Sequence, residues 1–245
     1  MEIKDRIINY WTNRSHDFAK LRYEELHSYM AKLWLNEIKT YLPKTHITSK
    51  NEFKILDIGT GSGFFALLLA KEGYCLTGID ITQSMIDEAI ASAKQHDLII
   101  DFQVMDAENL SFEDNTFDMI ISRNLTWTLP NPQKAYTEWH RVLKPEGILL
   151  NFDADYGNEQ FAQDLNKLPK NHAHQQVQTN LMQECDLIKN TLDISKTSRP
   201  QWDIEVLQQL KFTSVSVDLH IKERIYHHLD KFYNPAPVFL ITAHK

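Results

Sequence analysis

The sequence predicts an α/β protein built on one parallel sheet whose two faces are covered by helices. From Phe53 onward, short apolar runs alternate with amphipathic stretches, a pattern typical of strand–helix–strand units. The 245 residues suffice for one such domain with a substantial core, or for one domain plus an insertion. A hydrophobic content of 42% and a charged content of 24% are ordinary for a soluble globular protein.

The first forty-three residues are predicted to form a helical cap, 1–43. Apolar residues recur there at spacings of three and four, which places them on one helix face: Leu26, Met30, Leu33, Trp34 and Ile38. Pro43 closes this segment, and the polar stretch 44–52 is interpreted as a linker.

Five strands and three helices are predicted within residues 53–152. The strands are placed at 53–58, 74–79, 99–105, 117–122 and 147–152. The helices are placed at 64–71, ending before Gly73, at 82–96 with Thr82 as the N-cap, and at 132–143. This regular alternation is what predicts the covered parallel sheet.

The alternation stops in residues 153–199, which are rich in Gln, Asn and His. Helical apolar spacing there predicts a helical insertion lying over the sheet, with the periodic positions at Phe161, Leu165, Leu168, Val177, Leu181 and Ile188. Residues 200–245 are predicted to hold a helix that starts at Pro200, with Trp202, Val206 and Leu210 as its buried stripe. Two strands follow at 212–219 and 238–243, which brings the predicted total to seven.

A glycine-rich loop joins the first strand to the first helix of the core. Its glycines are Gly59, Gly61 and Gly63, and Asp57 precedes them. Glycines there let a ligand approach the amide groups at a helix N-terminus. A nicotinamide fingerprint needs a third Gly where this chain has Phe64. A carboxylate before the loop would repel a pyrophosphate but suits an ammonium group, which favours S-adenosylmethionine over a nicotinamide cofactor.

Two further carboxylates follow the next two strands. Asp80 is placed to accept hydrogen bonds from both hydroxyls of a ribose. Asp106 is placed to accept one from the exocyclic amine of adenine, with Ile81 and Ala107 packed on the ring. Ribose recognition is shared with nicotinamide proteins, so Asp80 alone does not separate the two cofactors.

Five segments of the chain resemble the class I S-adenosylmethionine-dependent methyltransferase family. They are ILDIGTGSGFFALLLA at 55–70, GIDIT at 78–82, MDAENLSF at 105–112, FDMIISRN at 117–124 and WHRVLKPEGILLNFD at 139–153. Their order and spacing make the resemblance specific over residues 53–152. It implies a Rossmann-like, doubly wound sheet of seven strands with the last strand antiparallel, within a single methyltransferase domain, 1–245.

The resemblance also implies roles for the residues of these motifs. The loop residues Asp57, Gly59, Thr60 and Gly61 would hold the methionine moiety of the cofactor. Asp80 would hold the ribose, and Asp106 with Ala107 the adenine. In related enzymes the residues after the fourth strand line the substrate channel, which points to Asn124 beside the cofactor and to Leu125 and Trp127 beside the acceptor.

An aromatic and basic stretch near the start of the chain is a candidate lid over the pocket. Related enzymes often close the pocket with an N-terminal helix, so Trp11 and Phe18 would cover it and Arg14 would pair with the cofactor carboxylate. An ordinary amphipathic helix with a solvated Arg14 is the alternative. Trp127 likewise either stacks on a flat or cationic acceptor or packs under the next helix.

Asp153 and Tyr156 are the candidate catalytic residues. They follow the fifth strand, so they are expected at the carboxyl edge of the sheet, where ligands bind. Methyl transfer is an in-line displacement that depends mainly on positioning, and a base is needed only if the acceptor carries a proton. Asp153 or Tyr156 would orient the nucleophile or supply that base. The alternative is that Asp153 ends the strand and caps a turn.

No metal site is predicted. His172 and His174 lie among polar residues that read as a solvated segment, and they lack a carboxylate or Cys at ligand spacing. His140 is interpreted as structural. Cys75 and Cys185 have no metal-ligand spacing and fit two free thiols in a reducing cytosol.

The leading functional hypothesis is a cytoplasmic enzyme that methylates a small molecule. The net charge of -7 argues against a nucleic-acid surface, and the start of the chain lacks a signal-peptide pattern. No apolar run reaches membrane-spanning length. The alternatives are a methyltransferase acting on tRNA or protein, and a non-catalytic protein that binds S-adenosylmethionine. The sequence does not predict the acceptor or the oligomeric state.

Overall fold

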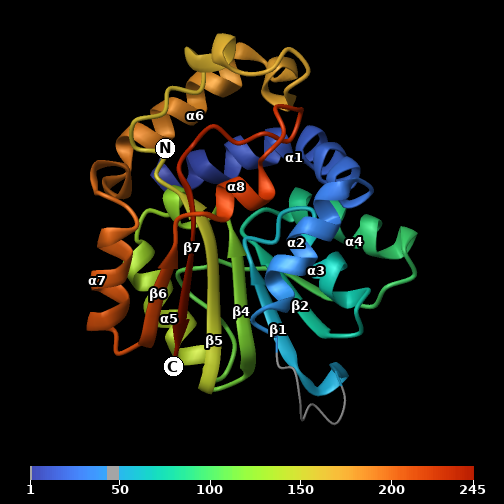
Figure 1. Cartoon of the computed structure of the whole chain (residues 1–245), viewed down its shortest axis with the longest axis vertical. Coiled ribbons are helices and arrows are strands. Elements are labelled where there is room, and N and C mark those ends of the chain that lie inside the picture. The colour runs from blue at the N-terminus through green and yellow to red at the C-terminus, as the bar shows by residue number, and fades with distance from the viewer. Residues whose placement is uncertain (1, 43–49) are drawn as a thin grey trace.

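A seven-stranded sheet forms the centre of the protein, whose computed structural model describes residues 2–42 and 50–245 (Figure 1). The strand order is β3-β2-β1-β4-β5-β7-β6. The strands are β1 (Lys54–Ile58), β2 (Cys75–Asp80), β3 (Asp101–Val104), β4 (Phe117–Arg123), β5 (Leu143–Ala154), β6 (Thr213–Asp218) and β7 (Val238–His244). Strand β7 runs antiparallel to both of its neighbours, and the other pairs are parallel. The predicted seven strands with an antiparallel last strand are confirmed.

Eight α-helices connect or cover these strands in the described residues. They are α1 (Ile3–Leu26), α2 (Tyr29–Lys39), α3 (Phe64–Ala70), α4 (Gln83–Gln95), α5 (Pro132–Val142), α6 (Thr179–Thr191), α7 (Gln201–Gln209) and α8 (Ile221–Ile225). Short 3-10 turns lie at Lys50–Glu52, Thr126–Thr128, Asp164–Lys167, Ala173–Gln176 and Asp193–Lys196. None of the described helices combines the length and apolar character that crossing a bilayer requires.

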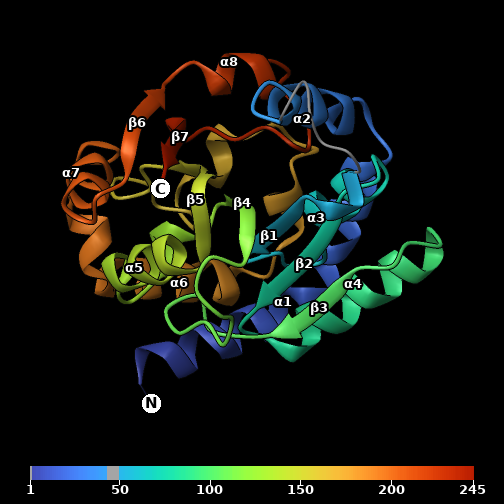
Figure 2. The same ribbon diagram turned by 90° about the horizontal axis from the view of Figure 1, so that it is seen from below.

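Helices lie on both faces of the sheet (Figure 2). Each face carries its own hydrophobic core. Helices α2 and α3 cover one face, where Trp34 and Phe65 pack edge to face with 5.2 Å between ring centroids. Helices α5 and α7 cover the other, where Trp139 and Leu207 are fully buried. Each such side chain contributes about 1.5–3 kcal/mol on burial. This packing holds the strand ends, and the loops that follow them, in fixed positions.

The carboxyl ends of the parallel strands meet at one edge of the sheet. Strand β1 lies between β2 and β4, so the direction of winding reverses beside it. Ligands of open α/β sheets bind at such a switch point. Helix α1 and the segment around α6 lie across this edge, at the top of Figure 1. The fold therefore places a roof of sequence-distant segments over the loops after β1 and β4.

The helical cap departs from the prediction at its middle, because α1 ends at Leu26 and a new helix begins. Ser28 is the N-cap of α2, and its hydroxyl accepts a hydrogen bond from the Met30 amide at 3.2 Å. The buried face of α2 carries Met30, Trp34 and Ile38, as the spacing predicts. Pro43 and most of the predicted linker fall in residues 43–49, outside the described residues.

The insertion is less helical than its apolar spacing predicts. Helix α6 is its one α-helix among the described residues, and Phe161 to Leu168 forms turns instead. The amides of Phe161 and Ala162 donate to the Asp186 carboxylate at 2.8 and 2.9 Å, which ties this turn to α6.

Two predicted helix details are confirmed only in part. Thr82 occupies the N-cap position of α4, but its hydroxyl donates to Asp80 at 2.9 Å and caps no helix amide. The buried face of α7 is formed by Asp203, Val206 and Leu207, while Trp202 and Leu210 are half-buried. Pro200 precedes this helix as its N-cap.

Candidate functional site

A cavity of about 480 Å³ lies at the switch point, between the strand ends and the roof formed by α1 and the insertion. This volume falls within the range of small-molecule sites. One part, the glycine-loop half, is lined by Asp57, Gly59, Thr60, Gly61 and Asp80. The other part, the insertion half, is lined by Arg14, Trp127, Tyr156, Phe161, His174 and Cys185. Trp11, Phe18, Asn124 and Leu125 also line the cavity.

The loop after β1 needs its glycines. Gly59 has φ of +68°, a conformation that other residues rarely adopt, and an added Cβ would lie 2.8 Å from Cδ1 of Leu125. At Gly61, with φ of +54°, a Cβ would lie 3.2 Å from Cε1 of Phe18 on α1. The backbone therefore passes close to both the roof and the loop after β4.

Asp57 is buried beneath this loop and organises it. Its Oδ2 accepts hydrogen bonds from the Thr60 hydroxyl at 2.6 Å and from the Ala66 amide at 3.1 Å. Burial, with a smaller contribution from the neighbouring Asp80 carboxylate, raises the pKa of Asp57 to about 7 against the lowering effect of these hydrogen bonds. A cation placed beside Asp57 would favour its ionised form.

Asp80 ties the end of β2 to the glycine loop. Its Oδ2 accepts from the Gly61 amide at 3.1 Å, and its Oδ1 accepts from the Thr82 amide at 3.0 Å. Burial raises the pKa of this carboxyl, while hydrogen bonds from the backbone lower it. Its carboxylate is thus fixed in orientation at the cavity wall.

A second, smaller cavity adjoins the first and shares Trp11, Gly59, Asp80 and Leu125 with it. Its remaining walls include the residues predicted to hold a planar base, Ile81, Asp106 and Ala107. Lys4 of α1, which the sequence analysis missed, reaches Asp106 at 2.7 Å and Glu108 at 2.8 Å. The first turn of α1 therefore closes the far end of the site.

Aromatic residues of α1 line the cavity. Trp11 packs edge to face on Phe18 and on Tyr10, with 5.6 and 5.1 Å between ring centroids. Arg14 is only 6% exposed, so the alternative of a solvated arginine is wrong. Its Nε and Nη1 atoms are buried and have no hydrogen-bond partner among the described residues.

A second charged group in the cavity wall was missed by sequence reasoning. Arg123, the last residue of β4, donates from Nη2 to Glu25 Oε1 at 2.8 Å and from Nη1 to Oε2 at 3.2 Å. Arg22 pairs with the same carboxylate. The Trp34 indole N–H donates to Glu25 at 3.0 Å, so this fully buried carboxylate is shared by two guanidinium groups.

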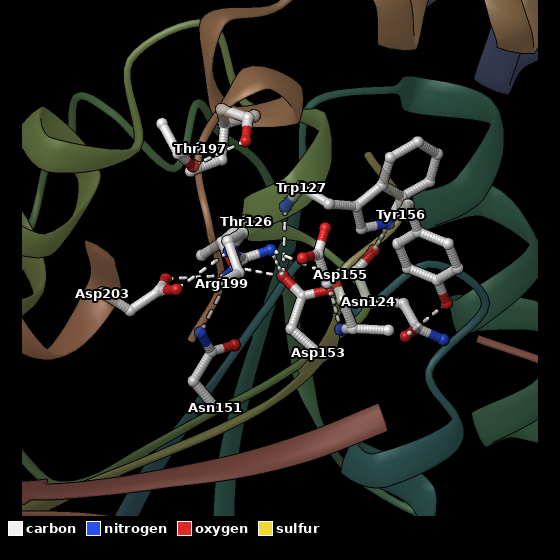
Figure 3. Close-up of polar contacts among 12 residues, drawn as sticks. Asn124, Thr126, Trp127, Asn151, Asp153, Asp155, Tyr156, Thr197, Arg199 and Asp203 are labelled. Carbon is white, nitrogen blue, oxygen red and sulfur yellow. Dashed lines mark hydrogen bonds and ion pairs between the residues drawn. The ribbon is translucent and has the colours of Figure 1, made fainter. Parts of the chain in front are cut away.

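The loops after β4 and β5 meet in the insertion half (Figure 3). The Tyr156 hydroxyl donates to Asn124 Oδ1 at 3.1 Å and accepts from Asn234 Nδ2 at 3.0 Å. Trp127 packs on Tyr156 with 4.8 Å between ring centroids, and its indole N–H donates to the Asn124 carbonyl. Burial raises the pKa of Tyr156 well above its ordinary value, so the phenol remains neutral.

Comparisons with known proteins agree on the class of this core. Residues 56–151 match a family model described as a methyltransferase domain. A Coxiella burnetii protein named ubiquinone biosynthesis O-methyltransferase is 34% identical over 116 residues, which are 47% of this chain and 49% of that protein. The chain thus spans about half the length of the curated relatives it matches.

Solved structures share the fold over a larger part of the chain. A candidate S-adenosyl-L-methionine-dependent methyltransferase from Methanococcus maripaludis aligns with a TM-score of 0.59 at 21% identity, covering 93% of this chain and 91% of that one. Phosphoethanolamine N-methyltransferase 2 of Haemonchus contortus, in complex with S-adenosyl-L-methionine, aligns with a TM-score of 0.57 at 19% identity over 86% of this chain and 52% of that one. The core of the chain is thus similar to a methyltransferase domain, and the chain shares the fold of class I S-adenosylmethionine-dependent methyltransferases.

Asp153 is not among the residues that line the cavity, and it lies in a group of polar side chains with Arg199 and Asp203 (Figure 3). It is 0% exposed. Its Oδ2 accepts from Arg199 Nη1 and from the Trp127 amide, both at 3.0 Å, and Thr126 bonds the same oxygen. Asp203 holds the other side of Arg199 at 2.8 and 2.9 Å. Asp153 therefore belongs to a buried structural network. This corrects the expectation that Asp153 acts as a catalytic base.

The two histidines of the insertion also differ from expectation, because they are not solvated. His172 is buried and donates from Nε2 to the Tyr233 carbonyl at 2.7 Å, while its Nδ1 accepts from the His174 amide at 3.1 Å. His174 lines the cavity, and burial lowers its pKa to about 3. Among the described residues, no group of three His, Cys, Asp or Glu side chains is placed to hold a metal ion.

Proposed function

We propose that this protein transfers a methyl group from S-adenosylmethionine to a small-molecule acceptor. The observation that carries the proposal is the continuity of one covered cavity, in which the glycine-loop half adjoins an aromatic insertion half. Because both halves open into the same space, two ligands bound there would lie in direct contact. Catalysis then follows mainly from proximity and orientation.

The glycine-loop half fits this cofactor in charge and shape. Asp57 and Asp80 supply negative charge where a dinucleotide would bring a phosphate, so they favour a ligand with an ammonium and a sulfonium. The adjoining pocket at Ile81 and Ala107 has the apolar walls that an adenine ring requires. When bound, S-adenosylmethionine supplies an electrophilic methyl carbon, and its sulfonium becomes a neutral thioether as the new bond forms.

The insertion half positions the acceptor and keeps water out. Trp127 and Tyr156 are fixed by hydrogen bonds through Asn124, so their rings form a rigid wall. In-line transfer requires the acceptor atom at about 3 Å from the methyl carbon. The neutral phenol of Tyr156 serves to orient groups and is not a base, whereas the neutral imidazole of His174 is available to accept a hydrogen bond from an acceptor hydroxyl.

The relatives bear on the kind of acceptor. Curated proteins similar over residues of the core are named ubiquinone biosynthesis O-methyltransferase. Their names, together with the aromatic lining of this cavity, support a small acceptor that is methylated on oxygen. A tRNA or a protein would need an open basic surface, and the acceptor half of this cavity is covered by α1 and the insertion.

Calorimetry with Asp80→Ala tests the cofactor site. We expect the parent protein to bind S-adenosylmethionine and the variant to bind it at least about tenfold more weakly, because hydrogen bonds to a charged group are lost. Asp101→Ala is the matched control, since that aspartate is exposed at the start of β3. Absence of binding by the parent would overturn the proposal, and unchanged affinity in Asp80→Ala would remove Asp80 from the site.

A further inference from the structure

Three arginines but only one buried glutamate lie in or beside the wall of the cavity. Arg14, Arg22 and Arg123 all line it, and Glu25 is the carboxylate that pairs with two of them. Asp57 and Asp80 lie in the glycine-loop half, where they hold loop amides and hydroxyls. The three guanidinium groups therefore exceed their buried partner by two positive charges.

Arg14 is the least compensated of the three. No carboxylate lies within ion-pair distance of it in the described part of the chain, and its Nε and Nη1 have no hydrogen-bond partner there. The other acidic residues that line the cavity outside the glycine-loop half do not supply Arg14 with a partner. Asp164 pairs with Lys167 at 2.6 Å, and burial raises the pKa of Glu159. A buried cation without a partner is costly in free energy. A ligand that brings a negative charge would remove that cost.

The positions of Arg14 and Arg22 along α1 separate their roles. The Arg22 guanidinium lies 4.8 Å from the centre of the Phe18 ring, and Phe18 in turn lies against the glycine-rich loop at Gly61. Arg14 lies two turns earlier, on the wall shared with Tyr10 and Cys185. Arg22 is thus the better partner for the carboxylate of the cofactor, and Arg14 faces the insertion half.

The walls around Arg14 describe the body of the ligand. Trp127, Tyr156 and Phe161 form a mutually packed group, with 4.8 to 5.8 Å between ring centroids. Such walls favour a flat ring over a flexible or strongly hydrated molecule. A planar guanidinium matches a carboxylate in geometry, because it can donate two parallel hydrogen bonds.

We infer that the methyl acceptor is an aromatic carboxylate, and that Arg14 binds its carboxylate group. This inference rests on the proposed methyl transfer and deepens it. It also replaces the expectation that Arg14 pairs with the cofactor. Arg14 selects the acceptor by charge, and the aromatic wall fixes the plane of its ring.

The test compares two matched probes, 3,4-dihydroxybenzoate and the neutral 3,4-dihydroxybenzamide, by calorimetry on protein saturated with S-adenosylhomocysteine. We expect the parent to bind the acid about tenfold or more tightly than the amide. In Arg14→Met this preference should disappear, while affinity for S-adenosylhomocysteine stays within about twofold of the parent. Arg22→Met should show the opposite pattern, with weaker S-adenosylhomocysteine binding and an intact preference for the acid.

Several results would overturn the inference. They are equal binding of acid and amide by the parent, no binding of the acid at all, and a loss in Arg14→Met that falls on S-adenosylhomocysteine. Failure of the parent to bind S-adenosylhomocysteine would instead overturn the proposed function, so the two failures are distinguishable.

A second measurement needs no ligand. Because Arg14 has no carboxylate partner in the described residues and its Nε and Nη1 have no hydrogen-bond partner there, Arg14→Met should leave the melting temperature of the ligand-free protein unchanged or higher. Arg123→Met should lower it, since Glu25 would lose its bidentate partner. A lower melting temperature in Arg14→Met would mean that this residue serves the fold, and would overturn the inference.

Discussion

The two halves of the cavity are built in different ways. The glycine-loop half comes from the ends of β1 and β2 and from the loop after β1, and its carboxylates accept hydrogen bonds from the amides of Gly61, Ala66 and Thr82. The insertion half is assembled from α1, from the loops after β4 and β5, and from the insertion. The difference indicates that the fold itself fixes the first half, whereas the choice of acceptor depends on segments added to the fold.

The largest loss of cofactor binding in the glycine-loop half is expected where its backbone comes closest to a neighbouring side chain. Gly59→Ala should weaken S-adenosylmethionine binding by about 100-fold, because the new Cβ would lie 2.8 Å from Leu125 at a φ of +68°. Calorimetry measures this. Gly73→Ala is the matched control, since that glycine also has positive φ but has its nearest neighbouring atom at 3.9 Å. Comparable affinity losses in both variants would contradict the claim.

The acid–base behaviour of Asp57 gives a second test of the glycine-loop half. Its pKa is about 7 in the free protein, and a bound cation should lower it, so binding below pH 7 must first remove a proton. The dissociation constant for S-adenosylhomocysteine should therefore rise by up to about tenfold per pH unit below 7 and level off above it. Calorimetry between pH 5.5 and 8.5 tests this over the window set by that pKa. In Asp57→Asn the dissociation constant should no longer depend on pH. A pH dependence that persists in this variant would show that another group titrates.

Lys4 offers a smaller test at the far end of the glycine-loop half. It bridges Asp106 and Glu108 but is about one third exposed, so its ion pairs are weak. Lys4→Met should weaken cofactor binding by no more than about threefold. Calorimetry at low and high salt measures the change. A tenfold loss would mean that Lys4 touches the cofactor directly.

The smallest effect on the reaction itself is expected from Asp153→Asn. Asp153 bonds Arg199, Thr126 and the Trp127 amide away from the cavity, so the folded variant should keep its rate of methyl transfer within about twofold. Its free energy of unfolding should fall by about 1–3 kcal/mol. Unfolding by denaturant measures the free energy of unfolding, and single-turnover kinetics measure the rate of methyl transfer. A stable variant that has lost the reaction would restore Asp153 as a catalytic residue.

The sequence predicts the glycine-loop half well because its parts are contiguous. The strand, the glycines and the carboxylates stand at fixed short spacings, so Asp57, Gly59 and Asp80 could be assigned to one edge of the sheet. The seven strands followed from apolar runs in the same way. Both depend on local patterns, which a single sequence displays directly.

The insertion half could not be predicted to the same depth, because its contacts join distant segments. Asp153 lies among the last residues of β5 and not after the strand, and its partner Arg199 lies 46 positions later, so nothing local reveals that pairing. Glu25 and Arg123 are 98 positions apart. The i,i+3 spacing of Arg22 and Glu25 was a weak signal of this cluster. His174 read as solvated because its neighbours are polar, yet α1 and the insertion enclose it.

The central claim is that the two halves together transfer a methyl group to a small molecule. The most direct measurement is incubation of the protein with methyl-labelled S-adenosylmethionine and a cell extract, followed by separation of metabolites, proteins and RNA. The account predicts label in the metabolite fraction, in an acidic aromatic compound, and its absence with Asp80→Ala. Label in protein or RNA, or no transfer by a protein that binds the cofactor, would contradict it.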